Sequence, residues 1–181
     1  RLDAGKPGNP RAVETGQLNP LVGATIAALR PHAPFDGMEP EALRFLAENV
    51  KLGYYARDTE IVGPSSGAVA KLYILKQGAV RGRPDIVARS ATGVDIVLGP
   101  GECFPLGALI GRRATAYSYR AQEDTFAYEL GDEDFRALLE RSPEFQRFCT
   151  DYLASLVDQS HRVLRAQLGE ALADEGRMRA P

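Results

Sequence analysis

The feature that most constrains the fold is a change in hydrophobic period between residues 50 and 130. In this segment, short runs rich in β-branched and aromatic residues alternate with turns such as Gly63-Pro64-Ser65-Ser66-Gly67 and Gly99-Pro100-Gly101. Turns at intervals of roughly ten residues are typical of an antiparallel sandwich or barrel. The pattern predicts about eight short strands arranged as a jelly roll. The expected strands are residues 51–56, 60–62, 71–76, 79–81, 86–88, 94–98, 117–121 and 125–130.

Helical patterns flank this segment on both sides. Apolar residues recur at helical spacing from Leu21 to Leu29, and Pro40 opens a second helix that ends near residue 49. After residue 130, Asp132 is a plausible N-cap for one helix, and Ser142-Pro143 supplies the N-cap and first position of another. The expected fold is therefore α+β, an antiparallel β-roll or jelly roll with N-terminal helices and a C-terminal helix pair.

The same patterns divide the chain into three parts. Residues 1–20 contain several Gly and Pro and are expected to form a flexible lead-in. Residues 21–169 are expected to form one domain, with helices in 21–49, the β-roll in 50–130 and the C-terminal helices in 132–169. Residues 170–181 form a polar tail that we expect to fray.

Composition excludes several classes of function. The chain has 22 Lys and Arg against 24 Asp and Glu, which argues against a nucleic-acid surface based on phosphate neutralisation. Its apolar runs are too short to span a membrane. The two cysteines cannot form a disulfide framework, so we expect a reduced, cytoplasmic protein. The two histidines lack partners at ligand spacing, and no catalytic constellation is present, so we expect neither a metal site nor an enzyme.

One segment, residues 98–115, has the features of a small anion site. It runs from a strand end through a Gly-rich turn into a short apolar helix with Pro105 in its first turn. Backbone amides in the first turn of a helix lack hydrogen-bond partners and favour a phosphate. Arg112 and Arg113 follow and can add charge-assisted hydrogen bonds, while Ala114 allows close approach and Thr115 offers a hydroxyl. From these residues alone, a plain crossover between strands with a solvated arginine pair is the favoured alternative to an anion site.

Residues 29–167 resemble the cyclic nucleotide-binding domain family. The matching motifs, in order, are Phe35-Asp36-Gly37-Met38, the strand–turn–strand of residues 71–80, the approach segment of residues 98–104, and Arg112-Arg113-Ala114-Thr115. The resemblance implies a β-roll that binds a cyclic nucleotide and relays occupancy through its C-terminal helices. It implies cyclic AMP or another nucleotide as the candidate ligand, no required cofactor, and Arg112 as the partner of the cyclic phosphate. The implied ligand-binding residues are Leu106, Gly107, Ala108, Leu109, Arg112, Arg113, Ala114 and Thr115.

The chain departs from the family where the resemblance implies a ribose contact. The family has Phe-Gly-Glu, and its Glu accepts the ribose 2′-hydroxyl, whereas this chain has Phe104-Pro105-Leu106. Leu106 has no hydrogen-bond acceptor, and an unpaired buried hydroxyl costs ~1–3 kcal/mol. Glu102 is a candidate replacement, although it matches the approach turn rather than the Glu position.

A more specific resemblance concerns residues 101–109 together with residues 119–126. These segments are similar to a bacterial subgroup of signal-transduction proteins, in which such a domain precedes paired CBS domains and a nucleotidyltransferase domain. The chain would then be the N-terminal sensor of a longer protein, as its start at Arg1 suggests, and the C-terminal domains of that protein would be its partners. The alternative is a degenerate roll that binds no ligand and forms a homodimer or docking scaffold through residues 145–168. We expect neither nucleic acid nor a membrane among the partners.

Overall fold

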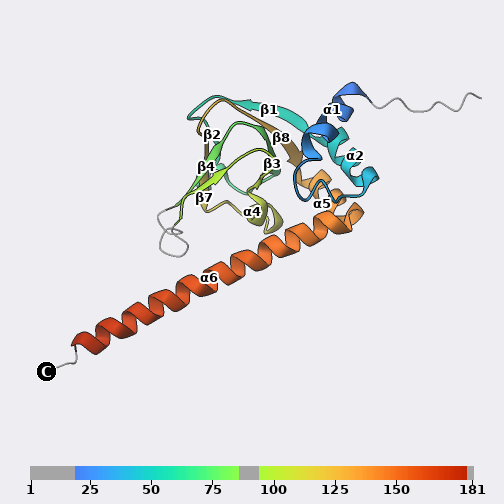
Figure 1. Cartoon of the computed structure of the whole chain (residues 1–181). Helices are drawn as coiled ribbons and strands as arrows, with labels where there is room; N and C mark the ends of the chain where they lie inside the picture. Colours follow the sequence, from blue (N-terminus) through green and yellow to red (C-terminus); the bar gives the residue numbers. More distant parts are fainter. Residues whose placement is uncertain (1–18, 86–93, 179–181) are drawn as a thin grey trace, which may run out of the picture.

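The computed structural model describes residues 19–85 and 94–178, and for residues 167 and 171–178 only the backbone. Two four-stranded antiparallel sheets form a β-roll, with strand orders β1-β8-β3-β6 and β2-β7-β4-β5 (Figure 1). The predicted α+β fold is confirmed. The strands are β1 Lys51–Tyr55, β2 Glu60–Val62, β3 Lys71–Gln77, β4 Val80–Pro84, β5 Ile96–Leu98, β6 Cys103–Phe104, β7 Tyr117–Ala121 and β8 Thr125–Gly131. The helices are α1 Pro20–Leu29, α2 Pro40–Asn49, the single 3₁₀ turn η1 Pro64–Ser66, α4 Leu106–Ile110, α5 Asp132–Arg141 and α6 Pro143–Met178.

Most of the expected strands lie where the alternation of polar and apolar residues places them. The expected strand at residues 94–98 is shorter in the structure, because β5 begins at Ile96. The expected strand at residues 86–88 lies outside the described residues. The two-residue strand β6 is not among the expected runs, because a pairing of only Tyr73 with Phe104 and Ile74 with Cys103 is too short to produce a periodic pattern.

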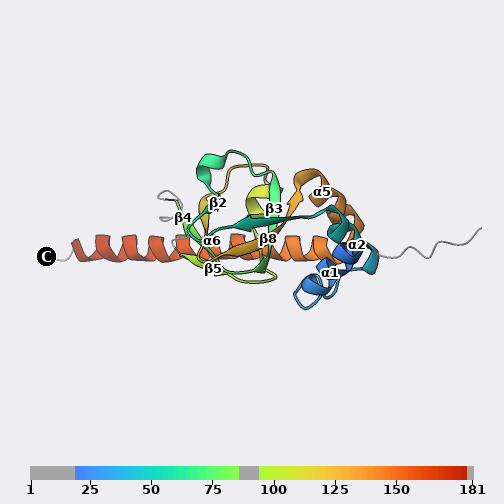
Figure 2. The same cartoon turned by 90° about the horizontal axis from the view of Figure 1, so that it is seen from above.

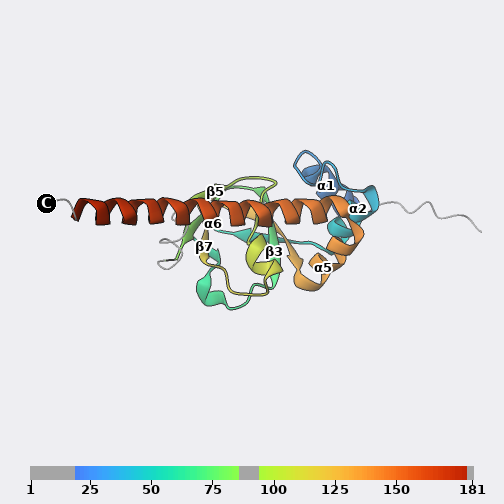
Figure 3. The ribbon, with the colours of Figure 1, turned by 90° about the horizontal axis from the view of Figure 1, so that it is seen from below.

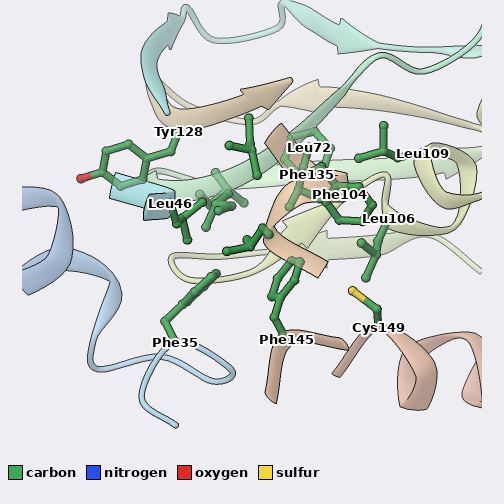
Figure 4. Close-up of a cluster of buried hydrophobic side chains, with 14 of the residues drawn as sticks. Phe35, Leu46, Leu72, Phe104, Leu106, Leu109, Tyr128, Phe135, Phe145 and Cys149 are labelled. Carbon is green, nitrogen blue, oxygen red and sulfur yellow. The ribbon is translucent and has the colours of Figure 1, made fainter. Parts of the chain in front are cut away.

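The core lies inside the roll and extends from it into the helices. Leu72, Ile74 and Phe104 come from the sheets and are essentially inaccessible to solvent. Phe35 and Leu46 enter this cluster from the N-terminal segment, and the side chains of Phe145 and Cys149 enter it from α6 (Figure 4). The helices at both ends of the domain are thus anchored to the same core as the strands.

Two helix starts define how the C-terminal helices leave the roll. Asp132, expected as an N-cap, is instead the first residue of α5, whose N-cap is Gly131. The reason is that α5 follows β8 directly and the Asp132 backbone N–H donates to the carbonyl of Ala70. Ser142 caps α6 as predicted, because its Oγ accepts a hydrogen bond from the backbone N–H of Phe145 at 3.1 Å.

Helix α6 is 36 residues long and crosses the whole roll (Figures 1 and 2). It continues to Met178, beyond the helix end that the sequence predicts at residue 169. Residues 170–178 include Glu, Ala, Leu, Arg and Met, all strong helix formers, and one internal glycine costs only about 1 kcal/mol. The apolar pattern weakens after Leu168, but helical propensity maintains the helix.

Candidate functional site

A groove of about 480 Å³ lies between α6 and the part of the roll that carries α4, β5 and β7. Seen from below, α6 runs across the roll beside α4, β5 and β7 (Figure 3). The roll contributes Val94, Ile96, Pro105, Gly107, Ala108, Arg113, Thr115, Ala116, Tyr117 and Tyr119, and α6 contributes Tyr152, Ser155, Leu156, Gln159 and Ser160. No carboxylate is among these lining residues of the described chain.

The aromatic wall of the groove is set by strand periodicity. Tyr117 and Tyr119 are two residues apart in β7 and therefore point to the same face of the sheet. The Tyr119 ring stacks on Phe104 with centroids 4.8 Å apart, and the rings of Tyr117 and Tyr119 are 5.9 Å apart. Tyr119 is only 5% exposed, so its ring is held by the core while one edge borders the groove.

The opposite wall is one face of α6. Tyr152, Leu156 and Gln159 are spaced four and three residues apart, which aligns them along a single helix face. This face approaches α4 closely at Gly107: a Cβ there would lie 3.2 Å from Leu156 Cδ1 and 3.7 Å from Tyr152 Cε1. A molecule in the groove therefore touches both the roll and α6.

The polar end of the groove is built from α4 and the loop that follows it. Pro105, which the sequence predicts in the first turn of this helix, is instead the N-cap of α4, and the helix begins at Leu106. The backbone N–H groups of Leu106, Gly107 and Ala108 belong to its first turn, where amides lack partners within the helix. Gly107 and Ala108 border the groove, so this turn offers N–H donors to an anion.

The two adjacent arginines are placed differently. Arg112 follows α4 with a positive φ of 50°, and its N–H donates to the carbonyl of Leu109 at 3.1 Å. Arg113 lines the groove, whereas Arg112 does not. The backbone of Arg113 is fixed on both sides, because its N–H donates to the carbonyl of Ala108 and its carbonyl accepts from the N–H of Val69, both at 3.1 Å.

Thr115 and the tyrosines supply neutral hydroxyls. Thr115 is 4% exposed, and its Oγ1 accepts from the backbone N–H of Tyr117 at 3.1 Å. Burial, with smaller contributions from Tyr152 and Tyr117, raises the pKa of Tyr119 despite a hydrogen bond with Thr115. Burial also raises the pKa of Tyr152. Both phenols therefore stay protonated at neutral pH, and Arg113 is the charged side chain in the lining of this groove.

The structure brings together half of the residues that the sequence predicts for the site. Gly107, Ala108, Arg113 and Thr115 line the groove. Leu106 and Leu109 do not, because their side chains lie in the core with 1% and 0% exposure (Figure 4). Arg112 and Ala114 are exposed and are not among the lining residues. Glu102, the candidate replacement acceptor, instead accepts a hydrogen bond from the backbone N–H of Gly99 at 2.6 Å.

The aromatic wall and the α6 wall are not among the site residues that the sequence predicts. The i, i+2 spacing of Tyr117 and Tyr119 places both on one face, but does not say that this face borders a groove. Tyr152 and Leu156 belong to an apolar helix stripe, which is equally expected of residues that cover the core.

Comparison with known proteins identifies the domain. Residues 55–142 match the family model for the cyclic nucleotide-binding domain. This part of the chain is a cyclic nucleotide-binding domain. The match begins at Tyr55, the last residue of β1, and ends at Ser142, so it includes strands β2 to β8 of the roll, α4 and α5. No curated protein matches the chain.

Solved structures share the fold of this cyclic nucleotide-binding domain. The catabolite activator protein of Thermus thermophilus is 27% identical, with a TM-score of 0.52 over 77% of this chain and 62% of that one. The regulatory subunit of a cAMP-independent protein kinase A from Trypanosoma brucei, a mutant bound to cAMP, is 14% identical, with a TM-score of 0.61 over 76% of this chain and 52% of that one. The regulatory domain of Toxoplasma gondii protein kinase A with cAMP is 19% identical, with a TM-score of 0.53 over 65% of this chain and 44% of that one. The chain thus spans 44% to 62% of the length of these proteins.

The described residues contain neither a candidate metal cluster nor a candidate membrane span. Among them, no group of three or more His, Cys, Asp or Glu side chains is arranged to hold a metal ion. Within the same residues, no helix combines the length and apolarity needed to cross a bilayer.

Proposed function

We propose that this cyclic nucleotide-binding domain is a regulatory sensor that binds cyclic AMP or a related phosphate-bearing ligand in the groove beside α6. The observation that carries the proposal is the convergence of Arg113 and the first-turn amides of α4 on a groove with aromatic walls. A guanidinium and helix N-terminal amides both favour a phosphate group. Tyr117 and Tyr152 offer aromatic surface to a base.

The groove also suggests how occupancy is relayed. Tyr152 and Leu156 come from α6, so a ligand would contact the helix as well as the roll. A ligand changes a conformational equilibrium only through different affinities for its two states. Direct contact with α6 supplies that difference if the helix packs differently against Gly107 when the groove is filled.

Ribose recognition would differ from that implied for the family. The residue at the family's Glu position, Leu106, is in the core, and no carboxylate lines the groove among the described residues. The neutral hydroxyls of Thr115 and Ser155, and the Gln159 amide, remain as polar partners. We therefore expect weaker discrimination between ribose and deoxyribose ligands than a carboxylate would give.

Isothermal titration with cyclic AMP, cyclic GMP and their 2′-deoxy analogues tests the proposal. Arg113→Gln should weaken binding about tenfold to a hundredfold, since a hydrogen bond to a charged group contributes ~1.5–3 kcal/mol. Arg112→Gln is the matched control, an adjacent exposed arginine outside the groove lining, and should leave binding nearly unchanged. No binding by any of these nucleotides, or an equal loss in both variants, would contradict the proposal.

The wider context is also a proposal. The chain would be the N-terminal sensor of a longer bacterial signal-transduction protein, and α6 would lead to its C-terminal domains, including CBS domains. The free thiols of Cys103 and Cys149 agree with a reducing cytoplasm. The sensor itself would be non-catalytic, and nucleic acid and membranes would not be among its partners.

A second candidate function is a scaffold that dimerises through α6. The observation that favours it is a row of exposed apolar side chains, Val157, Leu164 and Leu168, with 53%, 54% and 63% exposure. Their spacing of seven and four residues places them along one side of the helix. Of the predicted surface at residues 145–168, Phe145 and Cys149 are in the core, so only the later part is free to pair.

A further inference from the structure

The outer face of the second sheet carries a cleft of about 250 Å³ that is distinct from the groove beside α6. Its lining residues are Arg57, Asp58, Arg81, Arg83, Ser118, Arg120, Ala121 and Gln122. Strands β4 and β7, which bear most of them, lie on the side of the roll away from α1 and α2 (Figure 1). Ser118 and Arg120 alternate along β7 with Tyr117 and Tyr119, so the cleft and the groove use opposite faces of one strand.

The arrangement of charge in this cleft is unusual for a sheet surface. Arg81 of β4 lies directly opposite Arg120 of β7 in the antiparallel register, and like charges in that position repel. Arg83 lies opposite Ser118 one step further along. Four guanidinium groups and a single carboxylate, that of Asp58, line the cleft.

The arginines are held in place by groups around the cleft. Arg120 Nη1 donates to the carbonyl of Asp58 at 2.6 Å, and Nη2 lies 3.5 Å from Glu60 Oε2. Arg83 Nε lies 3.4 Å from Asp95 Oδ2. These contacts orient the guanidinium groups before any ligand arrives, which lowers the entropic cost of binding.

Arg81 differs from the other arginines of the cleft in its partner, which is a neutral side chain. The neutral side-chain amide of Gln122 faces Arg81 with its oxygen. This oxygen accepts one hydrogen bond from Arg81 Nε at 2.9 Å and another from Arg81 Nη2 at 3.0 Å. Among the ion pairs formed by the described residues, none involves Arg81. An arginine has five N–H donors, so Arg81 retains donors for an anion after binding Gln122.

We propose that this cleft binds a diphosphate group. Two facing guanidinium groups suit the paired oxygens of a phosphate chain, and each can donate two hydrogen bonds in parallel. No aromatic side chain lines the cleft, so a base or other apolar part of the ligand would contribute little. The site recognises the phosphates themselves, and nucleoside diphosphates and free pyrophosphate are its two candidate sources.

Titration of the whole chain with sodium pyrophosphate at low ionic strength tests the assignment. Arg81→Gln should weaken binding about tenfold or more, because it removes a charge that forms no ion pair with any carboxylate of the described residues. Arg44→Gln, on the exposed side of α2, controls for general loss of positive charge and should bind pyrophosphate as the wild type does. Arg113→Gln measures how much pyrophosphate binds in the other groove, and thermal melting should show that all three variants are folded.

Several outcomes would overturn the proposal. They include no pyrophosphate binding by the wild type, an equal loss in Arg44→Gln, and a loss in Arg113→Gln that Arg81→Gln does not show. ADP should bind with an affinity close to that of pyrophosphate, whereas a clear preference for ADP would point to a nucleoside pocket and contradict a phosphate-only site. Cyclic AMP binding should be unaffected by Arg81→Gln. This result separates failure of the diphosphate proposal for the cleft from failure of the nucleotide proposal for the groove.

Discussion

The side chain of Leu156 in α6 lies against the backbone of Gly107 in α4, with Cδ1 3.2 Å from the position that a Cβ on residue 107 would occupy. This contact joins the two walls of the groove at one point. Because Gly107 has no side chain, α6 can approach the roll closely enough to close the groove.

Gly107→Ala should therefore alter the position of α6 more than the stability of the domain. Alanine in a helix is favoured over glycine by roughly 0.5–1 kcal/mol, which offsets part of the cost of the tight contact. We expect the free energy of unfolding to change by less than about 1 kcal/mol. Amide hydrogen exchange in residues 152–160 should become faster.

The double variant Gly107→Ala/Leu156→Ala serves as the control, because it restores space at the contact. Exchange in α6 should then no longer depend on which residue occupies position 107. If Gly107→Ala leaves exchange in α6 unchanged, the contact does not set the helix position.

Leu106→Glu, which would restore the family's acidic residue, should destabilise the domain rather than improve ribose binding. The Leu106 side chain is 1% exposed, so a carboxylate there would lose its hydration without a partner. We expect a loss of at least about 3 kcal/mol, measured by chemical denaturation. Leu106→Met should cost less than about 1.5 kcal/mol, and a well-folded Leu106→Glu variant would show that this side chain can turn into the groove.

Ser142→Ala should weaken the junction between α5 and α6. The Ser142 Oγ accepts from the Phe145 N–H at 3.1 Å and donates to Glu39 Oε2 at 2.5 Å, and the residue is fully buried. Loss of an N-cap costs typically about 1 kcal/mol, and up to about 2 kcal/mol. Thermal denaturation should show this decrease, whereas Ser155→Ala, on an exposed turn of α6, should show almost none.

Glu129 should make the stability of the roll sensitive to acid. Burial by itself raises the pKa of Glu129, but hydrogen bonds from Lys71 and Tyr55 outweigh it and hold the pKa below its ordinary value. The distances are 2.6 Å from Lys71 Nζ to Oε2 and 2.5 Å from the Tyr55 hydroxyl to Oε1. A carboxylate with a lowered pKa stabilises the folded state above its unfolded pKa, and this contribution disappears as the pH falls through the folded value.

Glu129→Gln should therefore be less stable than the wild type at pH 7, by about 1–2 kcal/mol, and the difference should shrink toward pH 3. Urea denaturation at several pH values measures it. Glu48→Gln, at an exposed pair with Arg44, should differ little from the wild type at any pH. A difference for Glu129→Gln that does not vary with pH would contradict the proposed charge effect.

The scaffold hypothesis makes a prediction about oligomeric state. If α6 pairs with a second copy, Leu164→Glu should shift the protein to a monomer in analytical ultracentrifugation. Leu156 is unsuitable for this test, since it faces Gly107 and lines the groove. A wild type that is monomeric at all concentrations would remove the evidence for a scaffold.

How far the sequence predicts this domain depends on whether a local pattern determines the contact. Alternation and Gly/Pro turns locate most of the strands, because each strand has one buried face and polar turns at its ends. The same kind of pattern does not divide the stripe on α6: Phe145 enters the core, Tyr152 faces the groove and Leu164 is exposed, although all three continue one helical repeat. Whether a residue of the stripe meets the core, the groove or solvent depends on where the roll ends along α6. That is a property of the tertiary structure.

The arginine pair shows the same limit within the site. The motif matches Arg112 to the phosphate partner, but the left-handed backbone at Arg112 turns the chain, and Arg113 is the residue that borders the groove. A positive φ at a residue other than glycine is uncommon and leaves little trace in the sequence. Two adjacent arginines therefore cannot be distinguished without the backbone.

The length of α6 has a mechanical consequence. At 1.5 Å per residue, its 36 residues extend about 54 Å, and about 33 Å of this lies beyond Leu156. A straight helix acts as a lever about its contact with Gly107, so a tilt of about 5° there would displace Met178 by about 3 Å. A change in the groove no larger than the width of a methyl group would thus become, at the far end of the helix, a movement comparable to half a helical turn.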